Sequence, residues 1–295
     1  MKKYINKIKS TVKMINDFDQ RLGFIQEALG RIEARQDCSN ESLRIEDHEF
    51  RVYSQWGEDG IIQHLIRHVP IENKTFVEFG ASNYLESNTR FLLINNNWSG
   101  LVMDGDPENI ACIKSDPIYW RYNLKAECSF ITKENINDLL KSNGMSGDIG
   151  LLSIDVDGND YWVWKAIEGV SPRIVVLEYN SRFGADRAVT VPYDANFVRH
   201  QAHHSLLYFG ASLKALVNLG KQKGYSFVGC NSNGVNAFFV RSDLLADPLQ
   251  ELSVDVGFVA GKFREARDAD GKLLFLSAED ERTILESLPL IELDD

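Results

Sequence analysis

The longest regular pattern of hydrophobic positions lies at the start of the chain. Between residues 4 and 36, apolar residues recur every three or four positions, the period of one face of an α-helix. The series is Ile5, Ile8, Val12, Ile15, Phe18, Leu22, Ile25, Leu29 and Ile32. It predicts a helix about 50 Å long, because each helical residue adds 1.5 Å. Two consecutive spacings of three at Ile15 indicate a local overwinding of a heptad seam.

An apolar stripe of this length has to be covered, and three partners could cover it. We expect a homo-oligomeric coiled coil through residues 4–36. The stripe could instead pack on the body of its own chain. A third possibility is peripheral contact with an anionic membrane, favoured by the lysines at 2, 3, 7, 9 and 13. Acidic residues at 17, 19, 27 and 33 oppose that third possibility.

Residues 53–241 alternate between short apolar runs and amphipathic stretches. The runs are nearly continuous, which is typical of parallel strands buried on both faces. Strands are predicted at 75–79, 100–104, 149–154 and 173–177, with a shorter one within 120–129. Helices are predicted at 61–69, 107–116, 133–142, 161–168 and 206–223. Two final runs, 225–230 and 235–241, are joined by Asn-Ser-Asn-Gly, which is hairpin chemistry. The pattern predicts an α/β fold whose mostly parallel sheet ends in an antiparallel pair.

Composition sets the boundaries around this region. We interpret 1–36 as an oligomerisation helix, 37–52 as a polar linker, and 242–295 as a helical appendage with an acidic tail. The chain has 295 residues, of which 44% are hydrophobic, enough for one large α/β domain with such additions. Its net charge of −11 excludes a general nucleic-acid binder, which would carry a basic surface.

Cysteine usage and hydropathy bear on the compartment. The four cysteines are far apart and no CxxC occurs, so neither a zinc knuckle nor a disulfide framework is indicated. No apolar run reaches the roughly 18–20 residues of a transmembrane segment. We therefore expect a reduced, cytoplasmic protein.

Four predicted strands end in polar side chains, at Glu78, Asp104, Asp155 with Asp157, and Glu178. Ligands of open α/β sheets bind at this carboxyl edge. Glu78 and Asp104 are about 25 residues apart, as in a strand–helix–strand unit that holds a nucleoside. Neither GxGxxG nor GxxxxGK[ST] occurs, so no diphosphate cradle is indicated. Asp104 could accept hydrogen bonds from a ribose, or it could cap the helix that follows.

Five short motifs carry a resemblance to a known family. They are SQWGED (54–59), VEFGAS (77–82), VMDGDPEN (102–109), LLSIDVDGND (151–160) and VVLEYN (175–180). Together they resemble S-adenosylmethionine-dependent methyltransferases, and among these the FkbM-like family. The resemblance covers residues 53–241. It implies a Rossmann-like methyltransferase fold, with a mostly parallel seven-stranded sheet and an antiparallel last strand. The chain departs from the pattern at residues 83–85, where the family often has a second glycine.

The resemblance implies roles for individual residues. Glu78, Gly80 and Ser82 would contact the amino-acid end of S-adenosylmethionine, and Asp104 would hold its ribose. Ala126 or Glu127, after the third strand, would flank the adenine. Gln55 could reach the cofactor from the preceding segment, and Asp155 would serve either the cofactor or the structure.

The motif DVDGND (155–160) offers three carboxylates, next to Glu178 and Asn180 on the following strand. Oxygen ligands of this kind suit Mg²⁺ or Ca²⁺. The arrangement is similar to metal-dependent sugar O-methyltransferases of the macrocin type, in which Asp157 and Glu178, with Asn180 beside them, would bind a divalent cation. Asp160 would then be the general base. Alternatively, these acids stabilise the N-terminus of the next helix.

His203 and His204 are further candidates for the base, because they lie in a polar loop before the last long helix. We therefore expect an S-adenosylmethionine-dependent O-methyltransferase that methylates a sugar hydroxyl of a surface polysaccharide or glycolipid precursor. The alternative is a non-catalytic coiled-coil scaffold whose Rossmann-like body binds a nucleoside or a glycan.

Overall fold

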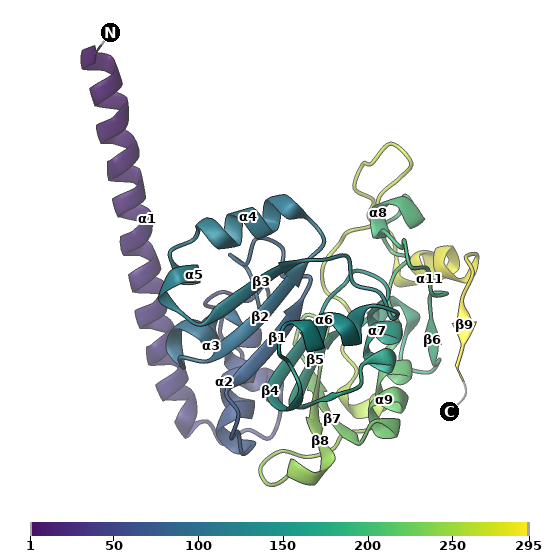
Figure 1. Cartoon of the computed structure of the whole chain (residues 1–295). Helices are drawn as coiled ribbons and strands as arrows, with labels where there is room; N and C mark the ends of the chain where they lie inside the picture. The colour runs from purple at the N-terminus through teal and green to yellow at the C-terminus, as the bar shows by residue number, and fades with distance from the viewer. Residues whose placement is uncertain (1, 294–295) are drawn as a thin grey trace.

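The computed structural model describes residues 2–293, and a seven-stranded sheet forms its centre (Figure 1). The strand order is β3-β2-β1-β4-β5-β8-β7. The strands are β1 (Thr75–Phe79), β2 (Ser99–Asp104), β3 (Leu124–Cys128), β4 (Gly147–Ile154), β5 (Val170–Glu178), β7 (Tyr225–Cys230) and β8 (Asn236–Arg241). The first five run parallel, and β8 lies antiparallel between β5 and β7. This is the Rossmann-like methyltransferase fold, so the predicted fold class is confirmed.

Helices cover both faces of the sheet, which explains why its strands are apolar on both sides. Adjacent residues of β1 show the division: Phe76 enters one hydrophobic cluster and Val77 the other. The cluster of Phe76 includes side chains of α2 (Glu58–His68), α3 (Arg90–Asn95), α4 (Pro107–Ser115) and α5 (Ile118–Arg121). The cluster of Val77 includes side chains of α6 (Ile136–Ser142), α7 (Asp160–Ala166) and α9 (Leu213–Gln222).

The strand order places a topological switch point beside β1. The chain passes from β1 to β2 on one side and later to β4 on the other. Helices that leave in opposite directions open a crevice at the carboxyl ends of such strands, where ligands bind. The expected nucleoside unit therefore lies at the centre of the sheet.

The last long helix is shorter than the sequence predicts. α9 begins at Leu213, and residues 206–212 are not helical, with bends of positive φ at Leu206 and Gly210. Their backbone bonds to other segments instead: Asn180 N–H donates to Ala211 O and Val191 N–H donates to Gly210 O. The apolar residues in this stretch pack in the core without forming a helix, which a helical period cannot distinguish from a helix start.

Helix α1 (Lys2–Gln36) projects from the body (Figure 1). Its last third contacts the body through Gly30, where a Cβ would lie 2.4 Å from the side chain of Val52. Gln26 donates to Val52 O, and Tyr53 OH donates to Glu27. Within residues 2–293, no helix is both long and apolar enough to cross a membrane.

The apolar stripe of α1 is on the uncovered side of the helix. Its exposed fraction runs from 46% at Leu22 to 62% at Phe18. The exposed members are Val12, Ile15, Phe18, Leu22, Ile25, Leu29 and Ile32. The side chains of Ile5 and Ile8 lie outside the part of the chain that the structure describes. The body of the same chain therefore does not cover the described part of the stripe.

The two segments that flank the predicted domain pack against it. Residues 37–52 form two short 3-10 helices, η1 (Asp37–Ser39) and η2 (Ile45–His48), and bury Ile45 and Val52. The C-terminal segment contains η4 (Ser242–Leu244), α10 (Val254–Gly257), α11 (Ala278–Glu286) and β9 (Ile291–Glu292). β9 pairs with β6 (Val189–Thr190), so this segment is fastened to the domain. Residues 294–295, the end of the predicted acidic tail, lie outside the described residues.

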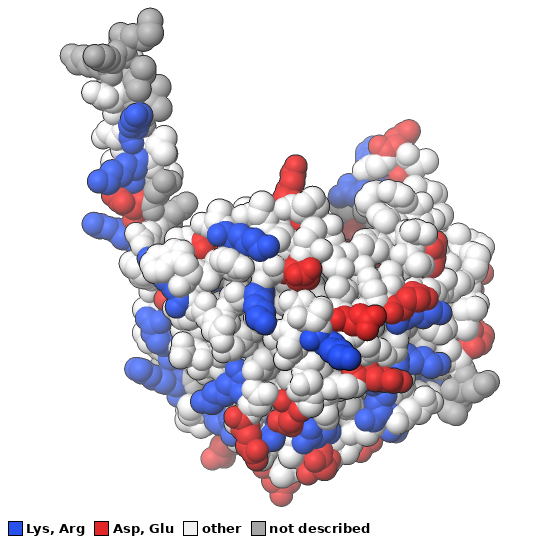
Figure 2. Space-filling view, viewed as in Figure 1, with Lys and Arg blue, Asp and Glu red and all other residues white. Residues whose placement is uncertain are grey.

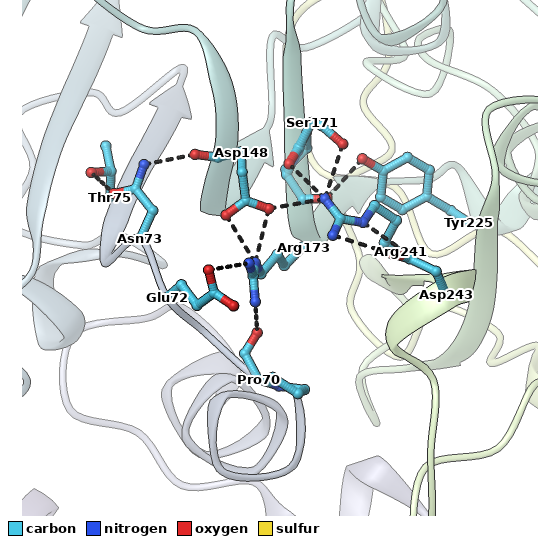
Figure 3. Close-up of polar contacts among 11 residues, drawn as sticks. Pro70, Glu72, Asn73, Thr75, Asp148, Ser171, Arg173, Tyr225, Arg241 and Asp243 are labelled. Atoms are coloured by element: carbon cyan, nitrogen blue, oxygen red, sulfur yellow. Dashed lines mark hydrogen bonds and ion pairs between the residues drawn. The ribbon is translucent and has the colours of Figure 1, made fainter.

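A polar network joins three strands at the end of the sheet opposite the carboxyl ends of the parallel strands, where β4 and β5 begin and β8 ends. Figure 3 shows Arg173 of β5 and Arg241 of β8 pointing toward Asp148 of β4. Arg173 Nε lies 2.9 Å from both carboxylate oxygens, and Arg241 Nη1 lies 3.0 Å from Oδ1. Partial burial raises the pKa of Asp148, but the hydrogen bonds and charges of the two arginines outweigh it, so the net pKa is lowered.

Candidate active site

A cavity of about 820 Å³ lies at the carboxyl edge of the sheet, the size of a ligand pocket. The ends of β1, β2, β4 and β5 form its floor. Loop 54–59, the short helix α8 (Arg199–Ala202) and part of the C-terminal segment form its walls. Segments far apart in sequence therefore meet in one cavity.

Gly80 ends β1 with a positive φ of 69°. A Cβ at this position would lie 1.6 Å from the carbonyl oxygen of Asp155, so glycine is required where the ends of β1 and β4 approach. The residues after it compensate for the missing second glycine. Ser82 and Tyr84 both adopt positive φ, at 47° and 63°, and the buried Tyr84 OH hydrogen bonds to Thr89.

Asp104 organises the turn after β2. Its Oδ2 accepts a hydrogen bond from Ser82 N (2.8 Å), and Oδ1 accepts from Asp106 N (2.8 Å) and Asn109 Nδ2 (3.0 Å). The N-cap of α4 is Asp106, which accepts from Glu108 N, so Asp104 is not the capping residue. A carboxylate can accept about four hydrogen bonds. Asp104 lines the cavity and retains capacity for a ligand hydroxyl.

Glu78 is buried at the end of β1, where it fixes residues 87–89. Its oxygens accept hydrogen bonds from Ser87 Oγ (2.6 Å), Asn88 N (3.0 Å) and Thr89 Oγ1. Burial raises its pKa, although these hydrogen bonds oppose the rise. Glu78, Ser87 and Asn88 all line the cavity. Glu78 therefore contributes to the lining and also holds two other lining residues in position.

The residues after β3 differ from those expected. Ala126 and Glu127 lie within β3 and do not line the cavity, because the strand continues to Cys128. Ser129, Phe130 and Ile131 line it instead. The side chain of Phe130 is 48% exposed. An aromatic ring at a cavity wall suits a flat base, and an aromatic residue directly after the strand was the available sequence signal.

The segment before α2 is held over the cavity by two acids. Asp59 Oδ2 accepts from the backbone N–H groups of Val52, Tyr53 and Ser54. Glu58 Oε1 accepts from Asn231 and Asn236 beside β8. These bonds place Gln55, which is exposed, and Trp56 at the wall of the cavity.

Three carboxylates converge on the other half of the cavity. Oxygens of Asp155, Asp157 and Glu178 lie within 4.8 Å of one another. Glu178 Oε2 is buried and has no hydrogen-bond partner. Burial first raises the pKa values of Asp155 and Glu178 well above the usual range. The charge of Asp157 adds to the rise in pKa at both groups, whereas a hydrogen bond with Glu178 opposes the rise at Asp155. The cluster therefore favours the binding of a cation.

Arg199, at the start of α8, supplies one positive charge to this cluster. Its Nη1 lies 3.0 Å from Asp157 Oδ1 and its Nη2 lies 2.7 Å from Glu265 Oε2. The guanidinium also stacks over Phe209 at 3.6 Å. Arg199 is thus fixed on the outer side of the cluster, with Glu265 as a fourth acid.

Asp160 and Asn180 do not reach the cavity, which corrects their expected roles. Asp160 is fully buried, and its two oxygens accept from Val156 N (2.8 Å) and Gly158 N (2.9 Å). Asn180 Nδ2 donates to the carbonyls of Leu207 and Phe209. The polar atoms of both side chains are used by the backbone, so Asp160 is unsuited as a base and Asn180 as a metal ligand.

The histidines also differ from the expectation. His203 Nδ1 is bound to Ser205 Oγ at 2.7 Å, and neither His203 nor His204 lines the cavity. His200, one turn earlier, is exposed and does line it. The short helix α8 places His200 at the cavity, and the polar sequence of this loop does not predict that helix.

The C-terminal segment contributes two residues that sequence reasoning missed, Phe263 and Glu265. Phe263 stacks on Trp56 with ring centres 5.5 Å apart, and Arg182 lies over the Phe263 ring at 5.2 Å. The predicted appendage therefore completes the cavity.

Comparison with known proteins gives only distant structural neighbours. No family model and no curated protein matches the chain. Among solved structures, the N-terminal domain of EvdMO1 with S-adenosylhomocysteine bound has a TM-score of 0.40 at 12% identity, over 62% of this chain and 79% of that one.

Two further neighbours carry methyltransferase names. An S-adenosylmethionine-dependent methyltransferase from Clostridium acetobutylicum has a TM-score of 0.40 at 11% identity, over 62% of this chain and 89% of that one. An O-methyltransferase from Bacillus cereus in complex with S-adenosylhomocysteine has 0.39 at 12% identity, over 72% and 88%. These neighbours are too distant to assign an activity, so function has to be inferred from the cavity itself.

Proposed function

We propose that this chain is an S-adenosylmethionine-dependent O-methyltransferase of the FkbM-like type. The observation that carries the proposal is that one cavity contains both a nucleoside-type site and a carboxylate cluster. The first consists of the Gly80 turn, Asp104 and Phe130, and the second of Asp155, Asp157 and Glu178. A methyl donor and a hydroxyl acceptor bound at these two sites would therefore have no protein segment between them.

The cofactor would occupy the half of the cavity beside β1 and β2. Asp104 would accept a hydrogen bond from the ribose, and the Phe130 ring would contact the adenine in place of Ala126 or Glu127. The methionine end would lie against Gly80 and the backbone of Ser82, with Gln55 closing the cavity above it. A cofactor without a diphosphate fits this turn, because the chain has no phosphate-binding glycine motif.

The acceptor half has ligands suited to Mg²⁺ or another divalent cation. Asp155, Asp157 and Glu178 would hold it, and the unpartnered Glu178 oxygen is the observation that supports this fit. Three carboxylates form an all-oxygen donor set of the kind that hard cations prefer. When bound, such an ion would lower the pKa of an acceptor hydroxyl.

Methyl transfer is an in-line displacement. The acceptor oxygen attacks the sulfonium methyl carbon, the C–O bond forms as the C–S bond breaks, and S-adenosylhomocysteine leaves with the electron pair. The hydroxyl proton would pass to His200, whose exposed side chain lines the cavity. Fixing both reactants in one cavity supplies much of the rate of such a reaction.

The acceptor that suits this half is a sugar hydroxyl, as in a surface polysaccharide or glycolipid precursor. The stacked Trp56 and Phe263 rings offer an apolar face, and Glu265 and Arg199 offer hydrogen-bonding groups beside it. A sugar ring has both kinds of surface. The face in Figure 2 intersperses basic and acidic side chains and shows no basic band for a nucleic acid.

We also propose that α1 assembles the protein into a homo-oligomer. Seven large apolar side chains in heptad spacing are exposed along the described part of the helix, and a second copy of the same helix matches their spacing and length. Charged residues of both signs along the helix favour this partner over an anionic membrane.

Two measurements test the enzyme proposal. Calorimetry should show S-adenosylhomocysteine binding at 1:1 stoichiometry, and isotope-labelled S-adenosylmethionine should transfer its methyl group to extracted cell-surface glycans. Failure to bind at millimolar ligand refutes the methyltransferase function, whereas binding without transfer to any acceptor would favour the scaffold. Loss of transfer after EDTA, restored by Mg²⁺, would support the metal, and unchanged transfer would exclude it.

A further inference from the structure

A second group of metal-ligating side chains lies where α1 joins the body, and none of its members lines the cavity. Asp37 of η1, His48 of η2 and His64 of α2 place one ligand atom each within 4.8 Å of the others. His48 and His64 are 1% and 2% exposed, and the Asp37 side chain is 8% exposed. Three separate elements thus converge on one buried point.

The hydrogen bonds of His48 indicate which of its nitrogens is available. Nε2 lies 3.0 Å from the carbonyl oxygen of Ser42, which can only accept, so Nε2 carries a proton. Nδ1 lies 2.7 Å from Asp37 Oδ1, a carboxylate oxygen that also accepts. Two bare lone pairs would repel at this distance, so a proton lies between them in a hydrogen bond, and a metal ion could take the place of that proton. Histidine ligands of metals commonly donate their other N–H to a backbone carbonyl in this way.

His64 supplies the independent sign of a missing partner. Its Nδ1 is buried and has no hydrogen bond. Leaving a buried polar atom unpaired is unfavourable. The ring stacks on His48, with ring centres 3.6 Å apart and an interplanar angle of 22°. A ring nitrogen without a hydrogen-bond partner is available as a metal ligand.

Asn40 and Arg67 complete the surroundings of Asp37. Asn40 Nδ2 donates to Oδ1 at 3.3 Å. Arg67 Nη1 lies 3.3 Å from Oδ2, and its Nη2 donates to Ala34 O at 3.1 Å near the end of α1. This contact occupies the outer carboxylate oxygen and leaves Oδ1 facing His48. The guanidinium charge opposes a nearby cation, so we expect weaker binding than at a four-ligand structural zinc site.

We propose that Asp37, His48 and His64 bind a transition-metal ion such as Zn²⁺, with water as fourth ligand, and that the ion fastens the end of α1 to α2. Two imidazoles and one carboxylate suit Zn²⁺. Tetrahedral ligand atoms lie about 3.4 Å apart at such bond lengths. The separations of at most 4.8 Å would therefore close by at most roughly 1.4 Å on binding, and the 2.7 Å between His48 Nδ1 and Asp37 Oδ1 would open by about 0.7 Å.

The test measures zinc binding to the full-length protein after chelator treatment. Calorimetry with Zn²⁺, in excess Mg²⁺ that fills the carboxylate cluster of the cavity, should give one equivalent bound, and Co²⁺ should give the visible absorption of a four-coordinate site. His64→Gln should weaken binding at least as much as the roughly 10–100-fold caused by losing a supporting group around a metal. His68→Gln is the matched control, because it lies one turn further along α2 next to His64 but outside the ligand set.

Two more variants make the result decisive. Asp37→Asn should lose the zinc event as well, which covers the case in which His64→Gln does not fold. Glu178→Gln should retain it, because that residue belongs to the oxygen cluster. Bound Zn²⁺ should also slow proteolysis within residues 37–48. The proposal fails if wild type binds no zinc, if His64→Gln and Asp37→Asn bind it like wild type, or if Glu178→Gln abolishes it; His48 and Asp37 would then share a proton only.

Discussion

Asp104 provides the sharpest test of the proposed cofactor site. Asn at this position preserves the size of the side chain but removes its charge and one acceptor oxygen. In the protein, the carboxylate already accepts three hydrogen bonds, from Ser82, Asp106 and Asn109. The remaining acceptor capacity is what a ribose hydroxyl would use, so Asp104→Asn removes it directly.

The size of the effect follows from the charge of the acceptor. A hydrogen bond to a charged group contributes about 1.5–3 kcal/mol, which corresponds to about 10- to 150-fold in a dissociation constant. We therefore expect Asp104→Asn to weaken S-adenosylhomocysteine binding by that factor in calorimetry. Part of the effect could arise from the turn itself, because Ser82 and Asp106 also lose a charged partner.

Glu127→Gln separates these contributions. Glu127 lies on the neighbouring strand β3 and does not line the cavity, so its loss should leave the affinity within twofold. The midpoint of urea unfolding of both variants reports on the turn. Unchanged affinity in Asp104→Asn refutes the ribose role, and so does a loss of the same size in Glu127→Gln.

Three further outcomes follow from the structure. Asp148→Asn should lower stability by about 1–2 kcal/mol at neutral pH, because Arg173 and Arg241 lose their shared partner, which is partly exposed. Since the pKa of Asp148 is lowered in the folded protein, this contribution is present above about pH 4 and is lost as the pH falls through the folded value. The stabilities of the two proteins in urea unfolding should therefore converge in acid. Deleting residues 1–21 should reduce the number of chains per particle in analytical ultracentrifugation, because an apolar stripe shortened to about 15 residues forms a marginal helix pair. An unchanged number of chains would exclude the coiled coil. His200→Gln should lower the rate constant of methyl transfer by roughly 10²–10⁴-fold, whereas an unchanged rate constant would exclude His200 as the base.

The order of strands and helices could be predicted because local signals agree with the fold. Near-continuous apolar runs mark strands buried on both faces, and Asn-Ser-Asn-Gly marks the hairpin between β7 and β8. The boundary of α9 could not be predicted. Leu206 to Ser212 are as apolar as a helix start, but the Asn180 side chain and β6 hydrogen bond to their backbone and hold it in a non-helical conformation.

The site was predictable as a set of strand ends but not as individual roles. Asp155, Asp157 and Asp160 occupy one short motif, yet only the first two face the cavity. Asp160 turns away because Val156 N and Gly158 N need acceptors in the tight turn. Phe263 could not be found from the sequence, since β9, which fastens the C-terminal segment to β6, has only two residues.

The contrast between Glu78 and Glu178 yields a last prediction about the cost of the carboxylate cluster. Both are buried acids at strand ends, but Glu78 is surrounded by donors, whereas Glu178 has one oxygen with none. Burial first, and then the charges of Asp155 and Asp157, raise the pKa of Glu178. An acid with a raised folded pKa contributes stability at low pH that is lost as the pH rises through that value, so ionised Glu178 destabilises the metal-free protein at neutral pH.

Glu178→Gln should therefore stabilise the metal-free protein by about 1–2 kcal/mol, the usual gain from relieving an active-site cost, while abolishing stabilisation by Mg²⁺. Glu78→Gln, the matched control, also removes an acid whose folded pKa is raised by burial, but it weakens the hydrogen bonds from Ser87, Asn88 and Thr89. Each hydrogen bond to a charged group contributes about 1.5–3 kcal/mol, so Glu78→Gln should instead destabilise the protein. Thermal unfolding in EDTA and in Mg²⁺ measures both effects. If Glu178→Gln loses as much stability as Glu78→Gln, Glu178 serves the fold. An acid that is kept for binding a cation should instead destabilise the protein when the cation is absent.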